Sequence, residues 1–320
     1  MIRRVLFAAI IPTAFAACSD DAGTITPVGP HHHYVVNKAT VPKNSTEARM
    51  YGLDVDGKAG VDNQLGMVLG TLATQGFKIQ DSIDLAVADG TINLLVNVQS
   101  EGFAGASGVQ VHLGKDAKTS TGGTPCEDQA NPTVATCGKQ LDGKGQFTVD
   151  GEAQAAIAGT FQNGVFAGGG VNNEVSLKIS LAGATVELDL IGAKAQLTGV
   201  TETGITSGIV AGAVSQDDLN TKVIPAIQSQ LGPLIMRDCT KLDMPTAMPA
   251  CGCPMGSTGG QIVTLFDTAP KDCSVSVEEI KTNGIIMSLL APDVVINNTM
   301  ALSIGLGFTA TGATYTVPGE

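Results

Sequence analysis

Tryptophan is absent from the 320 residues of this chain, and aromatic residues of all kinds make up only 4% of it. Proteins that cross the outer membrane with strands carry girdles of aromatic residues, and carbohydrate clefts commonly stack sugars on tryptophan and tyrosine rings. Charged residues are also few, at 15%, against 43% hydrophobic residues. The sequence therefore disfavours both protein classes and predicts a chain that buries a large apolar core.

Histidine is scarce as well: the chain has four, and three of them are consecutive at 31–33. His112 is then the one candidate general base outside that run. The sequence contains no G-x-S-x-G, H-E-x-x-H or phosphate-binding loop motif that would supply a nucleophile, a zinc site or a nucleotide site. Acidic pairs such as Glu187 and Asp189 alternate with apolar residues, which is typical of the solvated face of a strand. We expect no enzymatic activity.

Basic side chains are outnumbered, with 18 Lys and Arg against 30 Asp and Glu and a formal net charge of −12. A negative chain is repelled by phosphate backbones and by anionic membrane surfaces. We therefore expect no nucleic acid partner, and we look to the amino terminus for a membrane attachment.

The chain opens with "MIRRVLFAAIIPTAFAACSDD". Two arginines precede an apolar run that is too short to span a bilayer, which predicts an export signal. The "FAAC" ending resembles the lipobox of bacterial lipoproteins, so we expect a signal peptide at 1–17, lipidation of Cys18 and a flexible tether at 18–33. Ser19 favours the outer membrane. The alternative is an ordinary cleavable signal with an incidental cysteine. The three histidines of the tether are typical of a solvated linker, or of a transition-metal site.

Six cysteines remain after Cys18, an even number that predicts disulfides in an exported protein. Cys126 and Cys137 flank a polar loop and are expected to close it. The other four would form two bridges of undetermined pairing: Cys239, Cys251, Cys253 and Cys273. The alternative is a four-cysteine zinc or iron–sulfur site, although zinc sites prefer at least two residues between paired cysteines.

Apolar periodicity predicts an α+β fold, with antiparallel β-sheets in a sandwich-like arrangement and a few helices packed on one face. We expect one β-rich domain at 34–320, with disulfide-pinned loops at 120–140 and 233–275. The expected strands are at 91–99, 108–114, 145–151, 174–192 (a hairpin), 208–214 and 301–315. The expected helices are at 61–72 (with Asp62 as N-cap), 78–90, 215–231 (kinked at Pro225), 260–266 and 276–290, and residues 233–258 are expected to be irregular.

The first acidic loop, "YGLDVDGKAGVDNQLG" at 51–66, interleaves acids with glycines. Asp54, Asp56 and Asp62 are candidate calcium ligands, because calcium takes six to eight oxygen ligands. Lys58 places a positive charge where a ligand would be expected, and no glutamate follows at the last ligand position. The alternative is a turn that caps a helix.

A second acidic loop lies in "LFDTAPKDCSVSVEEI". Apart from one inserted residue, Asp267, Asp272, Ser276 and Glu279 follow the ligand spacing of an EF-hand between two expected helices. Cys273 stands where a glycine is usual. The alternative is a capping box, since Ser276 and Glu279 form an S-x-x-E pattern that requires no metal.

The "DNQLG" loop ending, "IQDSIDLAVADG" and "CSVSVEEI" resemble uncharacterised lipoproteins of myxobacterial type. That resemblance covers most of 50–315 and implies no known activity. We predict a lipid-anchored cell-envelope protein, located in the outer membrane according to Ser19, with a structural or interaction role and calcium as its cofactor. The alternative is a carrier of a lipid or another apolar ligand.

Overall fold

The computed structural model describes residues 25–58, 60–74, 79–181, 184–242, 251–268 and 271–319. The expected signal peptide, Cys18 and the first part of the expected tether lie outside the described residues, as do residues 182–183 of the expected hairpin turn. The described tether residues correct the prediction at one point. A strand, β1 (His31–Thr40), begins at the first of the three consecutive histidines, so that run belongs to the sheet and not to a linker.

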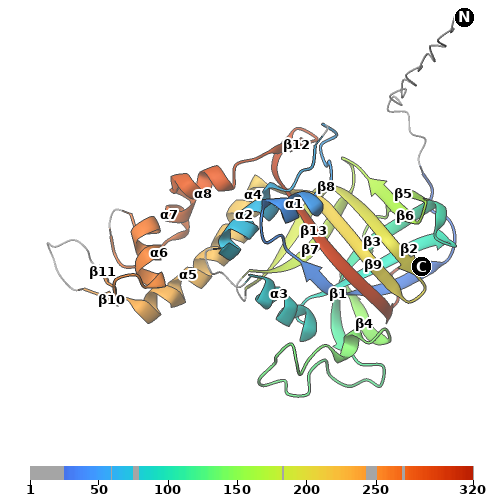
Figure 1. Ribbon diagram of the computed structural model, residues 1–320, viewed down its shortest axis with the longest axis horizontal. Helices are drawn as coiled ribbons and strands as arrows, with labels where there is room; N and C mark the ends of the chain where they lie inside the picture. The colour runs from blue at the N-terminus through green and yellow to red at the C-terminus, as the bar shows by residue number, and fades with distance from the viewer. Residues whose placement is uncertain are drawn as a thin grey trace, which may run out of the picture.

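Eight of the described strands form an antiparallel sheet that closes on itself (Figure 1). β1 pairs with β2 (Asn93–Glu101) on one side and with β13 (Thr299–Thr314) on the other. Between β2 and β13, the ring is completed in spatial order by β3 (Ala104–Lys118), β5 (Ile157–Gln162), β6 (Val165–Gly169), β8 (Ala184–Thr201) and β9 (Gly204–Ser215).

Three further strands extend this ring. β4 (Gly145–Asp150) pairs antiparallel with β3 and, through two residues, parallel with β13. β7 (Glu174–Leu181) forms the predicted hairpin with β8, and β12 (Val294–Ile296) pairs with β13. β4 packs Phe147 and Val149 on the outward-facing Val35 and Leu95. A second layer therefore covers part of the outer surface of the ring.

The sequence correctly predicts a β-rich, mostly antiparallel fold with fewer helices, but eleven of the described strands belong to one sheet instead of to the expected sandwich. Shifts in strand register allow a long strand to bend, and such bends help the sheet to close into a ring. β8 shifts register between Ile191 and Lys194, where Gly192 has a φ of 65°. The pairing of β13 with β9 shifts between Phe308 and Ala310, and its pairing with β1 shifts between Val36 and Lys38.

Alternating side chains fill the inside of the ring. Tyr34, Val96, Val111, Leu197 and Ile304 belong to one buried cluster, which continues into the helices. Between opposite walls of the ring lies a cavity of about 20 Å³, lined by apolar residues such as Leu94 and Phe308. A cavity of about 10–15 Å³ is the least that holds one water molecule. The described part of the interior is therefore a packed core.

The first three helices lie against the ring: α1 (Ser45–Met50), α2 (Gln64–Thr74) and α3 (Ile79–Ala88). The expected N-cap of the second helix was wrong. Asp62 lies too early, and Asn63 accepts the N–H of Gly66 instead at 3.0 Å. The carboxylate of Asp62 accepts the N–H of Val55, and the backbone of Asp62 pairs with Leu53, so Asp62 belongs to the acidic loop and not to the helix.

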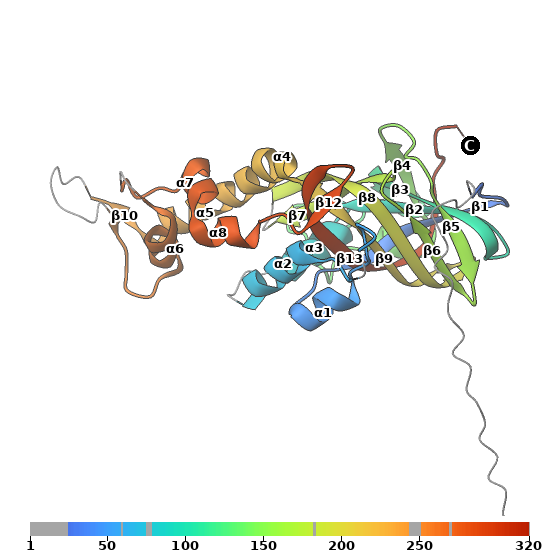
Figure 2. The same ribbon diagram turned by 90° about the horizontal axis from the view of Figure 1, so that it is seen from above.

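The remaining helices project from one end of the ring as a helical lobe, which Figures 1 and 2 both show. It contains α5 (Ile224–Asp238), α6 (Thr258–Phe266), α7 (Val277–Thr282) and α8 (Gly284–Leu289). α4 (Gln216–Asp218) and a π-helical turn, η2 (Leu219–Val223), lead into it from β9. The expectation of a few helices packed on one face does not describe this lobe, which extends from the end of the ring.

Two boundaries in the lobe differ from the sequence prediction. α5 continues past Pro233 to Asp238 because Leu231 and Ile235 are both buried by tertiary packing, so the irregular segment begins later. Pro225 lies in the first turn of α5, where its missing N–H is tolerated. The helix expected at 276–290 is two helices, since Asn283 has an extended ψ of 121° and caps the second with its side chain.

Candidate functional site

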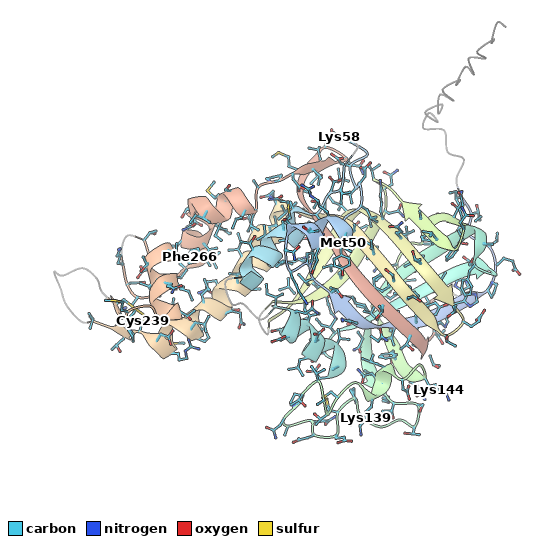
Figure 3. All side chains as sticks on the ribbon, viewed as in Figure 1. Met50, Lys58, Lys139, Lys144, Cys239 and Phe266 are labelled. Atoms are coloured by element: carbon cyan, nitrogen blue, oxygen red, sulfur yellow. A yellow bond between two sulfur atoms is a disulfide. The ribbon has the colours of Figure 1, made fainter. Side chains whose placement is uncertain are left out.

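The first acidic loop packs against the outside of the ring, beside β13 and β12. Its anchor is Val55, which is fully buried against Ala213, Val294 and Ile296. A β-bridge between Leu53 and Asp62 closes the base of the loop. Figure 3 shows Lys58 at the outer rim of the molecule, and its side chain is 72% exposed. The loop is thus held at its base and open to solvent at its tip.

The sequence-predicted ligands of this loop do come together. Asp54, Asp56 and Asp62 each place a carboxylate oxygen within 4.8 Å of the others. Backbone N–H groups of the loop already donate to them: Gly57 to Asp54 at 2.7 Å, Val55 to Asp62 at 2.8 Å and Lys58 to Asp56 at 2.9 Å. The three carboxylates therefore fold the loop around themselves.

Two lysines balance the negative charge of the cluster. The ammonium group of Lys58 lies 2.9 Å from Asp56, and that of Lys194 on β8 donates to the backbone carbonyl of Asp54. Burial acts to raise the pKa of Asp56, but the hydrogen bonds and charge of Lys58 outweigh it and lower that pKa. Burial raises the pKa of Asp62; the N–H of Val55 opposes this, and the charges of Asp56 and Asp293 add to it.

This arrangement fits part of a calcium site. Three carboxylates supply half or fewer of the six to eight oxygens that calcium takes. Lys58 competes with a metal ion for the carboxylate of Asp56, as the positive charge at this position of the sequence had indicated. Calcium binding here stays a prediction.

The residue after this cluster has a function that the sequence did not indicate. The side chain of Asn63 is 4% exposed, and it donates to the carbonyls of Ala48 and Gly305 and accepts from Gly66 and Gly305. All four of its hydrogen bonds are made inside the protein. Its position after an aspartate in an acidic run gave no signal of this role.

In the second acidic loop, the four predicted ligands are engaged in hydrogen bonds within the loop and at the start of α7. Asp267, 3% exposed, accepts the N–H groups of Asp272 and Cys273, at 3.2 and 2.9 Å. The carboxylate of Asp272 accepts hydrogen bonds from the backbone N–H and the hydroxyl group of Ser274. Ser276 and Glu279 form the capping box that starts α7. The close metal-type clusters found among the described residues do not include these four side chains.

Burial and these hydrogen bonds also shift the pKa values of Asp267 and Glu279. Burial raises the pKa of Asp267, against its two N–H donors, and the charge of Glu279 adds to the rise. Burial acts to raise the pKa of Glu279 too, but hydrogen bonds from Ser276 and Thr268 outweigh it and lower that pKa. Cys273 has a φ of 64°, the left-handed conformation that favours glycine. The glycine-like turn of the EF-hand pattern is therefore present, while calcium binding stays a prediction.

All six predicted disulfide cysteines are paired, as Cys126–Cys137, Cys239–Cys253 and Cys251–Cys273. The pairing that the sequence left open follows from a two-stranded ladder between β10 (Thr240–Lys241) and β11 (Cys251–Gly252). Thr240 pairs with Gly252, which brings Cys239 opposite Cys253. Cys251 reaches instead to the loop before α7.

The residues weighed for catalysis form no catalytic arrangement with one another. His112 is buried on β3, where its Nδ1 accepts the backbone N–H of Gln154 at 3.4 Å. Asp189 accepts from Ser176 and from the ammonium group of Lys222, while its neighbour Glu187 is exposed. Of the three consecutive histidines, His32 contacts Glu202 at 3.0 Å, and the ring of His33 lies 4.5 Å from that of Tyr315.

Comparisons of the chain with protein-family models, curated proteins and solved structures give no match. The resemblance to myxobacterial lipoproteins therefore stays a prediction. Within the described part of the chain, none of the helices combines the length and apolar character that crossing a bilayer requires.

Proposed function

We propose that this protein is a lipid-anchored module of the cell envelope that acts by contact with another envelope component. Acylation of Cys18 would hold the chain at the membrane, in the outer membrane according to Ser19. The ring would serve as a rigid body and the helical lobe as the contact surface.

The observation that carries this proposal is the filled interior of the ring. A carrier of a lipid or another apolar ligand needs a pocket of about 300–1,000 Å³. The cavity between the walls of the ring measures about 20 Å³. Side chains such as Leu94 and Phe308 occupy the space that a ligand inside the ring would need, which disfavours carriage within the described part of the ring.

The placement of the lobe also supports a contact role. The chain enters β1 at one end of the molecule, and the lobe lies at the other end of the long axis (Figures 1 and 2). An anchor preceding β1 would therefore direct the lobe away from the attachment point. Several large apolar side chains of the lobe are exposed to solvent, and a partner that covered them would bury apolar surface: Met236, Met255, Leu265, Ile285 and Met287.

Calcium belongs to the same proposal, at the first acidic loop only. Its support is the gathering of Asp54, Asp56 and Asp62 within 4.8 Å. Extracellular modules bind calcium with dissociation constants of about 10⁻⁴–10⁻³ M. With Lys58 competing, we place this loop in that weak range.

Two measurements test the proposal. Cys18→Ala in the full chain should move the protein from the membrane fraction to the soluble fraction, and it should remove the label from a metabolically incorporated fatty acid. Native mass spectrometry and solvent extraction of the full chain should find no stoichiometric apolar ligand beyond the acyl chains. Retention of Cys18→Ala in the membrane would overturn the anchor. A bound lipid at one per chain would establish the carrier instead.

A further inference from the structure

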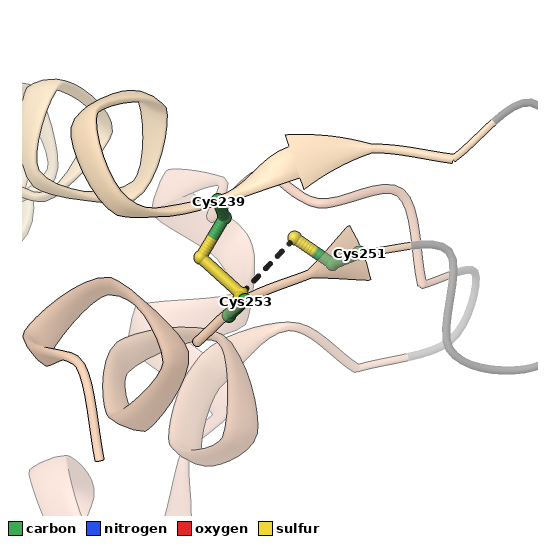
Figure 4. A group of neighbouring side chains, drawn as sticks. All are labelled: Cys239, Cys251 and Cys253. Atoms are coloured by element: carbon green, nitrogen blue, oxygen red, sulfur yellow. Dashed lines mark hydrogen bonds between the residues drawn. A yellow bond between two sulfur atoms is a disulfide. The ribbon is translucent and has the colours of Figure 1, made fainter. Parts of the chain in front are cut away.

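Two disulfides of the helical lobe lie in contact with each other. The Sγ of Cys253, bonded to Cys239, lies 3.6 Å from the Sγ of Cys251, which is bonded to Cys273 (Figure 4). The sulfur atoms of Cys239, Cys251 and Cys253 all lie within 4.8 Å of one another. The four sulfurs thus form one cluster, built from the end of α5, from β11 and from the loop before α7.

An open cavity gives access to this cluster. It measures about 550 Å³, and its lining includes Cys251 and Cys253 together with Met255, Val263 and Lys271. Cys239, Cys253 and Cys273 are partly exposed, whereas Cys251 is 5% exposed. A thiol in solution can therefore approach the Cys239–Cys253 disulfide. The side chain of Cys251 also lines the cavity but is mostly buried, and the Sγ of Cys253 lies beside it.

We infer that these four cysteines form a thiol–disulfide exchange site, in which a thiolate on one pair attacks the other. When Cys253 is a free thiolate, its sulfur attacks the Sγ of Cys251. A new Cys251–Cys253 bond forms, the Cys251–Cys273 bond breaks, and Cys273 leaves as the thiolate. No electrons enter or leave the protein, because one disulfide and one thiolate are exchanged for another disulfide and another thiolate.

The backbone permits this step. Cys251 lies on β11 and Cys253 directly follows this strand; residues two apart in an extended chain share a face, with Cα atoms about 6.6 Å apart. Disulfides span Cα separations of about 4.4–6.8 Å, so the new bond lies near the upper limit of that range. The step therefore requires side-chain rotation more than backbone movement. The other disulfide, Cys126–Cys137, lies in the loop beyond β3, and the described cluster does not include it.

The test uses the variant Cys239→Ser in the full, oxidised chain, where Cys253 has lost its partner without any added reductant. After acid quenching, alkylation and peptide mapping, we expect the thiol label to be shared between Cys253 and Cys273. Label on Cys253 alone would overturn the inference. The matched control is Cys126→Ser, which leaves Cys137 unpaired. The sulfur cluster of the described residues does not include Cys137, so the label should stay on Cys137.

A second measurement covers the case in which Cys239→Ser does not fold. The unmodified chain is treated with a limiting amount of a small dithiol, which is oxidised to its cyclic disulfide as it reduces one bond of the protein. Exchange predicts that a Cys251–Cys253 linkage appears among the partly reduced forms, with thiols at Cys239 and Cys273. If partial reduction produces only the separate thiol pairs of the native disulfides, the two bonds are independent and the inference is wrong.

Discussion

The side-chain amide of Asn63 pairs with both backbone groups of Gly305, as a neighbouring strand would. It donates to the carbonyl of Gly305 at 3.0 Å and accepts its N–H at 2.8 Å. β1 pairs with β13 only as far as Gly307, and β12 takes up the pairing at Ala301, so Gly305 lies in the gap between these two neighbours. Asn63 continues the pairing there and fixes the acidic loop to the ring.

Asn63→Ala should lower the free energy of unfolding by about 3 kcal/mol. The variant leaves buried N–H and C=O groups unpaired on Gly305 and Ala48, and each such group costs about 1–3 kcal/mol. Urea denaturation followed by circular dichroism measures the change. The control is Asn172→Ala at an exposed position, for which about 0.5 kcal/mol or less is expected. Equal effects at the two sites would refute the role given to Asn63.

Gly305→Ala should destabilise the same junction from the other side. A Cβ atom at Gly305 would lie 2.0 Å from the backbone oxygen of Tyr51, so the segment that leads into the acidic loop must move. Overpacking of this kind costs about 1–3 kcal/mol. Gly170→Ala is the matched control, because no atom lies within 4 Å of the added carbon. Thermal unfolding of the two variants should separate them clearly.

Calcium should stabilise the full chain through the first acidic loop. A dissociation constant of about 10⁻⁴ M gives about 1.4 kcal/mol at millimolar calcium. Lys58→Gln should enlarge the shift in melting temperature, because it frees Asp56 from its internal cation. Asp54→Ala should abolish the shift, and Asp267→Ala should leave it unchanged. If neither the unmodified chain nor Lys58→Gln responds to calcium after treatment with EDTA, the loop does not bind the ion.

The stability that Asp238 contributes should disappear in acid. Its hydrogen bond from Arg237, with that from the N–H of Gly259, lowers the pKa of Asp238 to about 2. Because this folded value lies below the ordinary aspartate pKa of about 3.9, the contribution is complete above that pH and is lost as the pH falls towards 2. The melting temperatures of the unmodified chain and of Asp238→Asn should therefore differ near neutral pH and converge in acid. A constant difference would contradict this assignment.

Local signals in the sequence predicted local structure. The alternation of apolar residues correctly predicted the strands that became β2, β9 and β13, and the hairpin of β7 and β8, because strand periodicity is written in neighbouring residues. Ring closure depends on pairs such as Tyr34 with Gly312, far apart in the chain, and no local pattern records them. β5 and β6 were not assigned, since glycine and alanine weaken their alternation.

In the candidate sites too, the sequence predicted contacts within a short loop but not contacts between distant parts of the chain. The spacing of Asp54, Asp56 and Asp62 predicted that their carboxylates would meet, because they belong to one short loop. The role of Asn63 depends on Gly305, and the charge of Lys194 on β8 reaches the loop only through the fold. The disulfide pairing could not be chosen from cysteine spacing, since it is set by the register of β10 and β11.

The pairing of β1 with both β2 and β13 has a consequence for biosynthesis. The strand made first is held by the strand made last, so the ring cannot be completed on a ribosome before the chain is nearly finished. Until then β1 and β9 expose unpaired edges, which attract other chains, and contacts between such distant residues form slowly. A nascent chain therefore keeps these two edges open until β13 has been made.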